Sequence, residues 1–507
     1  MTGWLLRIKN WRGMRHRCYR LWQRDVIFWR RHRKAIISWT VILFHVLGIF
    51  SSIRAVMQSR TPQGAIAWAV SLNTFPYVAV PAFWVFGSFE FEDYLTARSQ
   101  AREKSRTVEK ELRQRLSDED LVTAPTDEWE QVMLQLAGLP FTIGNSAELL
   151  QNGGETYDSL LKGIDDAQDY VLFQFYIIRD DEIGRKFRDA LVKKAAAGVR
   201  VYAMYDEIGS MGLPASFKAP LVKAGGQFIP FNTTQGFGNR LRLNFRNHRK
   251  VMVVDGKQAW VGGINIGDEY LNVGKPSSDV YVRDTHIKMS GPIVQMVQAT
   301  FIEDWYWAAR NLPKLNWDPE PSTSGSMKML CLPTGPSTTL DTCALYYLTA
   351  INKARHRVWI STPYFVPDEQ IVSAIALAVL RGVDVRIMIP QKTDSHLINA
   401  SHLGIVGEME PTGAKIYSYQ KGFIHQKVML VDDRYSFVGT ANFDNRSFRL
   451  NFEITMLADN EAFAKKTEEM LKDDFSHAVL LPKKKYEESS FVQRLMARTA
   501  LLLSPVQ

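Results

Sequence analysis

The sequence feature that most constrains the fold of this chain is a motif that occurs twice. The first copy starts at His248 and the second at His425. In each copy a lysine follows at +2, an aspartate at +7, a glycine at +14 and an asparagine at +17. Chance rarely preserves five positions at identical offsets. We therefore expect a tandem duplication in which both units present the same group of polar side chains.

The segments around the two motifs share one order of expected strands and helices. An apolar strand is followed by an amphipathic helix, a turn with a glycine (Gly198 or Gly382) and a second strand,. Such alternation is typical of α/β folds. The three elements occupy residues 171–178, 181–197 and 199–206 in the first copy and residues 358–366, 368–381 and 386–390 in the second. Loop composition at 312–328 predicts the boundary between the copies.

The residue types of the motif are those of an anion site with a nucleophile and an acid. Side chains two apart on a strand face the same way, so the histidine and lysine of each copy should point into one pocket. The glycines after the motif, Gly262 and Gly439, would let an anion approach backbone N–H groups. Two histidines with two lysines suit phosphoryl transfer. Because lysines repel cations and no HExxH occurs, we expect neither a metal nor another cofactor.

Four acidic residues accompany the histidines. Asp255 and Asp432 complete the motif after the expected buried strands VMVV and VMLV, and we interpret them as structural supports rather than proton carriers. Asp284 and Glu453 occupy similar places later in the two copies. A carboxylate beside an imidazole fixes its tautomer and stabilises the imidazolium. The alternative is that Asp284 and Glu453 are surface acids at strand edges.

Two apolar stretches near the N-terminus predict membrane insertion. Residues 35–53 and 65–89 are long enough to form two transmembrane helices in a hairpin,. The arginine-rich start before them predicts, by the positive-inside rule, that residues after the hairpin lie in the cytoplasm. Pro76 and Pro81 lie inside the second stretch, so a re-entrant or interfacial helix is the alternative there.

The charge of the chain is concentrated at one end. The net charge is +9, and residues 1–34 hold eleven Lys/Arg against one acid, Asp25. The remainder is close to neutral, which argues against a broad nucleic-acid groove. Three cysteines without a CxxC pair favour neither a zinc site nor a disulfide framework, and indicate a reducing compartment,.

The paired H-x-K-x₄-D motifs resemble those of the phospholipase D superfamily. Together with the apolar hairpin containing TPQGAIAW and the chain length, they are similar to the bacterial cardiolipin synthases. That resemblance implies two tandem phospholipase D-like α/β sandwich repeats related by a pseudo-twofold axis, with one active site at their interface. It also implies that two phosphatidylglycerols give cardiolipin and glycerol through a covalent phosphohistidine, without metal.

The resemblance assigns roles to particular residues. His248 would be the nucleophile and His425 the acid and base. The two motifs by themselves do not distinguish these roles. Lys250 and Lys427 would hold the non-bridging phosphate oxygens. Asn265 and Asn442 would donate hydrogen bonds to those oxygens. Apart from the resemblance, Arg240, Arg242 and Arg246 precede the first histidine closely, and they either contact lipid phosphates or form a solvated basic loop,.

The resulting expectation is a multi-pass protein of the inner (cytoplasmic) membrane with its catalytic domains on the cytoplasmic side. The expected partners are phosphatidylglycerol and anionic membrane lipids, with no nucleic acid, and a homo-oligomer is left open. Alternatives are a phospholipase D-type hydrolase, a phosphatidyltransferase with another lipid alcohol, a nucleic-acid enzyme and an inactive scaffold. The C-terminal stretch 491–503 either lies on the membrane or docks on the core.

The expected domains follow the chain in order. They are a basic segment (1–34), two transmembrane helices (35–90), a charged helical linker (91–140), the first phospholipase D-like domain (141–318) and the second with a C-terminal amphipathic helix (319–507).

Overall fold

The computed structural model describes most of the chain, which forms two compact units, 1–89 and 90–507. The described residues are 32–59, 62–87, 92–231, 245–271, 281–323, 325–336, 340–393 and 395–503. Most of the predicted basic segment 1–34, together with Arg240 and Arg242, lies outside the described residues.

The first unit contains one helix that is long and apolar enough to cross a membrane. This helix, His32–Gln58, has a mean hydropathy of 2.0 over its most apolar window. Its outward side chains are large and apolar, Ile42, Ile49 and Phe50 among them. About 20 apolar residues at 1.5 Å per residue cross a bilayer core of ~30 Å. Among the described residues this is the single helix that meets both criteria.

The second apolar stretch is not the single span predicted from the sequence. It forms α2 (Pro62–Thr74) and α3 (Pro76–Phe86), which are broken at Phe75–Pro76. The ring centroids of Trp68 in α2 and Phe83 in α3 lie 5.2 Å apart. A straight helix would separate two residues at that spacing by about 20 Å, so the chain folds back on itself. Proline at the start of α3 lacks the N–H that would continue the helix.

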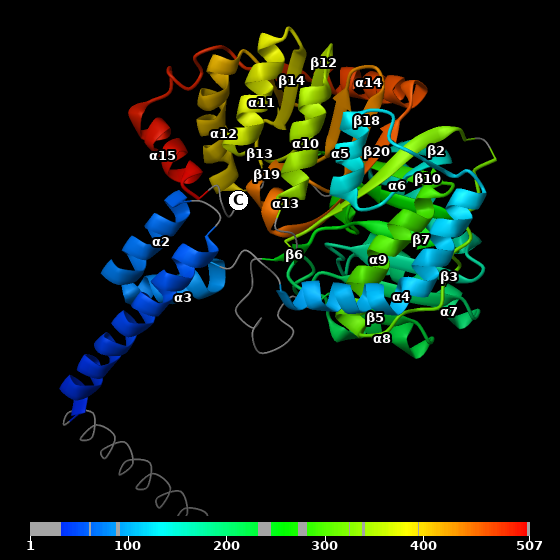
Figure 1. Ribbon diagram of the computed structural model, residues 1–507, viewed down its shortest axis with the longest axis horizontal. Coiled ribbons are helices and arrows are strands. Elements are labelled where there is room, and N and C mark those ends of the chain that lie inside the picture. Colours follow the sequence, from blue (N-terminus) through cyan, green and yellow to red (C-terminus); the bar gives the residue numbers. More distant parts are fainter. Residues whose placement is uncertain are drawn as a thin grey trace, which may run out of the picture. The chain divides into compact units, whose positions relative to one another are not determined.

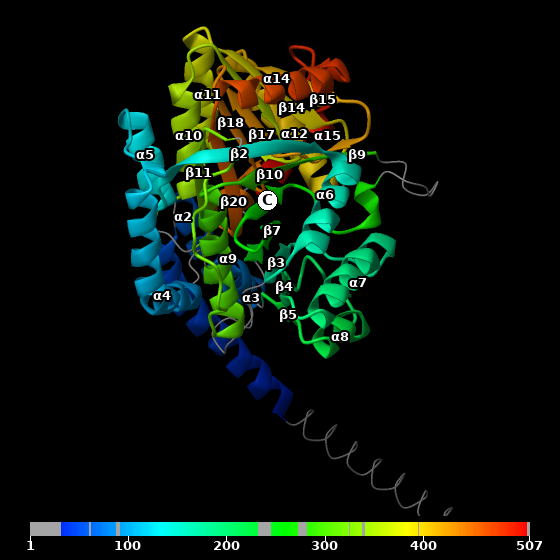
Figure 2. The same cartoon turned by 90° about the vertical axis from the view of Figure 1, so that its right-hand side faces the viewer.

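The second unit is built on one large sheet whose two parts repeat the same strand order (Figures 1 and 2). From the outer edge inward, the first part contains β5 (Gln227–Pro230), β4 (Arg200–Tyr205), β3 (Tyr170–Phe175), β7 (Val251–Val254), β8 (Gln258–Gly262), β10 (Thr285–Ser290) and β2 (Phe141–Gln151). The second part contains β21 (Ala478–Leu480), β15 (Lys415–Tyr419), β14 (Asp384–Pro390), β12 (Arg357–Ser361), β17 (Val428–Val431), β18 (Tyr435–Gly439), β20 (Asn451–Asp459) and β11 (Met327–Thr334).

The two parts join where β2 pairs antiparallel with β11. In each part three strands are parallel (β3, β4 and β5; β12, β14 and β15), and the next strands are antiparallel. Apart from β21, each strand of one part has a counterpart at the same place in the other. The α/β class and the tandem arrangement predicted from the sequence are confirmed.

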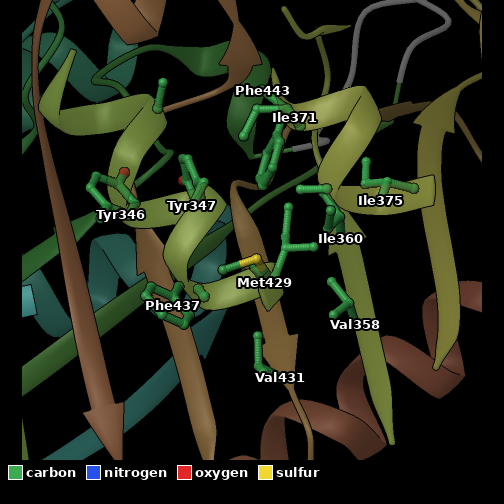
Figure 3. Close-up of a cluster of buried hydrophobic side chains, with 14 of the residues drawn as sticks. Tyr346, Tyr347, Val358, Ile360, Ile371, Ile375, Met429, Val431, Phe437 and Phe443 are labelled. Carbon is green, nitrogen blue, oxygen red and sulfur yellow. The ribbon is translucent and has the colours of Figure 1, made fainter. Parts of the chain in front are cut away.

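Helices cover both faces of each part of the sheet. The first core is formed with α6 (Asn152–Asp166), α7 (Glu182–Ala196) and α8 (Ala215–Lys223), while α9 (Ile293–Ala309) packs on the opposite face. The second core uses α5 (Glu128–Ala137), α10 (Thr342–Lys353), α11 (Glu369–Leu380) and α12 (His396–Met409), with α14 (Glu461–Ser476) beside β17 and β18. Figure 3 shows this second core, where Tyr346 and Tyr347 of α10 lie beside Phe437 and Phe443.

The segment predicted as a charged linker belongs to the second unit instead. It forms α4 (Glu92–Asp118), β1 (Val122–Thr123) and α5. Buried apolar side chains on α4, including Leu112 and Leu116, occupy one face, and Trp129 and Met133 of α5 enter the second core. The high charge of α4 reflects its solvated face, whereas its apolar residues recur at the helical period.

Candidate active site

The two motif histidines lie in extended segments just before strands rather than on them. His248 and Lys250 are between β6 (Arg246–Asn247) and β7, and His425 and Lys427 are between β16 (Phe423–Ile424) and β17. All four side chains are buried. The sequence analysis placed these residues on the strands, whereas the strands begin just after them, at Val251 and Val428.

Each histidine segment pairs with a strand of the opposite repeat. β6 runs parallel to the start of β20, and the His248 N–H donates to the Phe452 carbonyl at 2.9 Å. In the same way β16 runs parallel to β9 (Val282–Arg283), and the His425 N–H donates to the Arg283 carbonyl at 2.7 Å. An acid follows each partner residue directly, Glu453 after Phe452 and Asp284 after Arg283. Each histidine segment is therefore placed beside an acid of the opposite repeat.

The crossed pairing makes two histidine–carboxylate pairs. His248 Nδ1 lies 2.9 Å from Glu453 Oε2, and His425 Nδ1 lies 2.7 Å from Asp284 Oδ2. The paired residues are 205 and 141 positions apart in the chain. Both carboxylates are fully buried, so the alternative that they are surface acids does not hold. In each pair Nδ1 is occupied, which leaves Nε2 as the reactive nitrogen.

The two carboxylates have different surroundings. Glu453 also accepts hydrogen bonds from the Thr440 hydroxyl at 2.6 Å, the Ser447 hydroxyl at 2.9 Å and the Asn451 amide at 3.0 Å. Asp284 accepts one further bond, from the Thr285 N–H at 2.7 Å.

This difference explains why the two copies differ at one motif position. The second copy has Thr440 where the first has Gly263. A Cβ at Gly263 would stand 2.1 Å from Asp284 Oδ1. Only glycine therefore leaves room for the aspartate in its present position.

The electrostatics favour a neutral imidazole beside a charged carboxylate in both pairs. Burial lowers the pKa of His248 to about 4 and outweighs the opposing effect of Glu453. Burial and the Lys427 charge likewise lower the pKa of His425. Burial acts to raise the pKa values of Glu453 and Asp284, but the histidines and lysines beside them lower both. At neutral pH the Nε2 lone pair of each histidine is therefore free to accept a proton or to attack.

The two lysines are held close to the histidines they accompany. Lys250 Nζ donates to the His248 carbonyl at 2.5 Å, and Lys427 Nζ donates to the His425 carbonyl. Burial lowers the pKa of Lys250 well below its ordinary value, and the Lys427 charge adds to this lowering. Because the neighbouring Lys427 disfavours the charged form of Lys250, an anion bound beside the two lysines would stabilise the charge on Lys250,.

The two asparagines differ in how they are engaged. Asn265 accepts from the Ile177 N–H at 3.1 Å and donates to the Tyr270 hydroxyl at 2.8 Å. Asn442 donates to Asp444 at 3.3 Å, and its Oδ1 has no hydrogen-bond partner among the described residues. Each side chain keeps donor capacity because an amide carries two N–H groups.

Asp255 and Asp432 lie in the turns that follow the motif strands, away from the imidazoles. Both have a positive φ, 53° and 52°, which aspartate tolerates better than most residues,. Asp255 accepts from three successive backbone N–H groups that begin at Gln168, and Asp432 does the same for three that begin at Arg355. This geometry supports the interpretation that the two aspartates brace the strands.

A buried ion pair lies beside His248, and the motif does not predict it. Arg249 donates to Asp304 of α9 at 2.7 Å and to the Glu453 carbonyl at 3.0 Å. Asp304 also accepts from Tyr94 of α4 at 2.6 Å. Beside the other histidine–carboxylate pair, Arg283 of the first repeat pairs with Asp474 of α14 in the second repeat at 2.7 Å. Sequence analysis missed these residues because each lies far along the chain from its partner. The one signal in the sequence was Arg249 itself, a charged residue inside a motif that the sequence analysis expected to be buried.

Stability should fall as the pH drops, because several histidines are buried and uncharged. Burial lowers the pKa to about 4 for His248 and His402 and to about 3 for His286. Between these values and the ordinary 6.5 only the unfolded chain binds the protons, so stability rises with pH across that window. At about pH 5 each group should cost about 2 kcal/mol relative to neutral pH.

Thermal unfolding of the full chain, followed by fluorescence at pH values from 7 down to 5, measures this effect. The variant His402→Gln keeps an acceptor for the Phe365 N–H, which now donates to His402 Nε2 at 3.3 Å. Its Tm should decline less steeply with falling pH than that of the unchanged chain. Parallel declines would contradict the prediction.

Fold and site together define a class. A duplicated α/β fold whose halves each contribute a histidine and a lysine to one buried cluster is a phospholipase D-like protein. A family model described as "Cardiolipin synthase, PLD-like domain" matches residues 160–305 and 347–475. The chain belongs to this cardiolipin synthase family of PLD-like proteins.

Two relatives of similar length agree with the family. Cardiolipin synthase A of Pseudomonas putida (strain GB-1) is 42% identical over 94% of this chain and 99% of its own length. Cardiolipin synthase A of Pseudomonas fluorescens (strain Pf-5) is 42% identical over 93% of this chain and 98% of its own length. The crystal structure of phosphatidylserine synthase from Haemophilus influenzae Rd KW20 matches with a TM-score of 0.57 at 17% identity, covering 75% of this chain and all of that one. The latter likeness shows the fold.

Proposed function

We propose that this chain is a cardiolipin synthase, which condenses two phosphatidylglycerol molecules to cardiolipin and glycerol. The observation that carries the proposal is the crossed pairing, which gathers His248, His425 and their lysines into one buried cluster. A phosphodiester is an anion that this cluster suits, and the family relationship names the lipid product. The two halves would be related by a pseudo-twofold axis with the site between them.

The first step forms a phosphohistidine. Nε2 of His248 attacks the phosphorus of one phosphatidylglycerol, and the bond from phosphorus to the headgroup glycerol oxygen breaks. That oxygen takes a proton from Nε2 of His425, and glycerol leaves. The reaction uses no metal or cofactor. His425 must be protonated at this point, and the bound phosphate would favour this because its negative charge raises the pKa of a nearby imidazole.

Hydrogen bonding to the two carboxylates supports His248 as the nucleophile. Glu453 accepts three bonds besides that from His248, so its charge is already stabilised and it attracts an imidazole proton less,. Asp284 accepts one besides that from His425, so His425 is the better candidate to carry a proton. The attacking nitrogen must be neutral, and His248 is the histidine whose environment favours that state more.

The second step transfers the phosphatidyl group. Nε2 of His425, now neutral, removes the proton from a glycerol hydroxyl of the second phosphatidylglycerol. The resulting alkoxide attacks the phosphorus, the phosphorus–Nε2 bond breaks, and His248 is restored. Lys250 and Lys427 would balance the charge on the non-bridging oxygens of the five-coordinate transition state, with Asn265 and Asn442 as hydrogen-bond donors. Asp255 and Asp432 would act only through the strands they brace.

The acceptor determines which lipid enzyme this is. Purified full-length protein in vesicles that contain phosphatidylglycerol should produce cardiolipin and free glycerol in equal amounts, measured by mass spectrometry of the lipids and by a glycerol assay. Phosphatidic acid with glycerol and no cardiolipin would indicate that water is the acceptor and would overturn the proposal in favour of a phospholipase D-type hydrolase.

Membrane anchoring by the first unit is part of the same proposal. The helix His32–Gln58 would span the inner membrane, with the basic residues before it on the cytoplasmic side,. Placing the catalytic unit in the cytoplasm then requires the chain to return across the bilayer after this helix. The proposed domains follow those expected from the sequence with two changes. Residues 35–90 hold one candidate span followed by the short helices α2 and α3, and residues 92–140 are assigned to the catalytic unit.

A further inference from the structure

The C-terminal helix α15 (Phe491–Leu501) is a well-formed element with two different faces. Ser490 and Gln493 form a capping box at its start, in which each side chain bonds to the other's backbone N–H. A capping box stabilises a helix N-terminus. The helix is therefore defined by its own sequence as well as by its contacts.

One face of α15 docks on α12. Ala497 and Ala500 are buried there, and Leu501 lies against Gly404 of α12 so closely that a Cβ at that glycine would be 2.7 Å from it. Arg498 adds an ion pair to Glu408 of α12 at 2.9 Å. Small residues and a glycine let the two helices approach, so this face has a partner within the chain.

The opposite face is apolar and exposed. The spacing i, i+1, i+4, i+5 gathers its large side chains on the side away from α12. Phe491 is 72% exposed and Leu502 is 78% exposed, although both are large hydrophobic residues. The face consists of Phe491, Val492, Leu495, Met496, Leu502 and Leu503. It is called the α15 apolar face below.

Positive charge accompanies this face. Lys483, Lys484 and Lys485 are exposed in the segment that leads into α15, and Arg494 is half-buried on the helix. From residue 482 to 503 the chain has five Lys or Arg and two acids, Glu487 and Glu488. An apolar helix face flanked by cations matches the two layers of an anionic membrane surface, acyl chains below and headgroups above.

The position of α15 relates this face to the catalytic cluster. His402 of α12 accepts a hydrogen bond from the Phe365 N–H in β13 (Phe365–Val366). β13 pairs with β19 (Phe443–Asp444), which follows Asn442 directly. Figure 1 shows α15, α12, β13 and β19 in succession across the second half. A membrane that contacts α15 is thus connected to Asn442 of the second motif through α12, β13 and β19.

We propose that the α15 apolar face lies in the interfacial layer of an anionic bilayer and holds the catalytic unit against the membrane. The basic residues beside it select negatively charged lipid, and the exposed leucines and phenylalanine enter the acyl layer. This inference does not depend on which reaction the site performs. A second copy of the chain, or another part of this chain, would bury the same face without lipid contact, and the experiment separates these occupants.

The test uses the full chain with Cys18→Ser, because Cys331 and Cys343 are buried. Leu495→Cys is labelled with an environment-sensitive fluorophore and reconstituted into phosphatidylcholine vesicles with or without phosphatidylglycerol. The matched control is Val222→Cys on α8, since Val222 is 55% exposed and Leu495 is 54% exposed. The expected result is a blue-shifted emission at 495 that acyl-brominated lipids quench, stronger with phosphatidylglycerol, and a water-like, unquenched emission at 222.

Two outcomes would overturn the proposal, and a third would overturn the role of the basic residues in it. Equal emission at 495 and 222 would mean that the face is in water. A blue shift at 495 without lipid quenching would mean that protein covers it, and a 495–495 disulfide would identify a second copy. Quenching that stays the same after Lys483→Gln, Lys484→Gln and Lys485→Gln in phosphatidylglycerol vesicles would remove the basic segment from the proposal.

Discussion

Replacing His248 or His425 by asparagine is expected to lower the rate of cardiolipin formation by at least about three orders of magnitude. Each asparagine keeps a polar side chain of similar reach but supplies neither a nucleophilic nitrogen nor a group that can shuttle a proton near neutral pH. Groups that act as a unit in catalysis each cost nearly the whole effect when removed. Initial rates on phosphatidylglycerol vesicles measure the loss. The control is His477→Asn at the C-cap of α14, where the imidazole contacts Asp473 and Ser476.

The same two variants identify the nucleophile. A phosphatidyl ester with a good leaving group needs no acid, so His425→Asn should still form the acid-labile phosphoenzyme and then stop. His248→Asn should form none. The reverse pattern, detected with a radiolabelled phosphorus, would exchange the two roles. Undiminished turnover in both variants would remove the cluster from catalysis altogether.

Replacing Arg249 by methionine should reduce the free energy of unfolding by about 3–5 kcal/mol, which is the usual cost of removing one partner of a buried ion pair. The side chain is fully buried, and besides Asp304 it satisfies the carbonyls of Glu453 and Thr334. Asp304 would keep neutral donors but lose its counter-ion. Because the Glu453 carbonyl also loses its donor, the position of the carboxylate beside His248 should shift and the maximal rate should fall.

An exposed ion pair provides the matched control. Lys162 and Asp166 on α6 pair at 2.9 Å with side chains 72% and 56% exposed. Lys162→Met should change stability by no more than about 0.5 kcal/mol, because solvent screens such pairs. Denaturant unfolding of both variants in the same detergent compares them. Equal losses would show that burial adds nothing to the Arg249–Asp304 pair.

Much of the fold was predictable because its signals are local. The turn glycines, the helix N-caps Asp181 and Asp368 and the buried strand runs all lie within a few residues of the elements they define,. The repetition of the motif also predicted that two similar units follow one another, which a single copy could not show. The tandem α/β arrangement followed from these signals, as did the first apolar helix.

The errors occurred where tertiary contacts override local composition. The apolar count of residues 65–89 is sufficient for one span, but α2 and α3 fold back and bury Leu72 against Ala79 and Phe83. The many charged residues of α4 led to the prediction of a linker, although Tyr94 on this helix is buried and its hydroxyl donates to Asp304, more than two hundred residues along the chain. Hydropathy measures how many apolar residues a segment has, and it does not say what they contact.

The sequence by itself determined the chemical groups of this protein: two histidines, two lysines and two later acids, at matching places in two repeats. Only the tertiary structure decided their partners. His248 pairs with Glu453 and His425 with Asp284 because β6 and β16 each pair with a strand of the other repeat. Strand pairing between repeats depends on how distant segments meet in space, and nothing in the local sequence says which acid will face which histidine. Neither half has a complete histidine–carboxylate pair of its own.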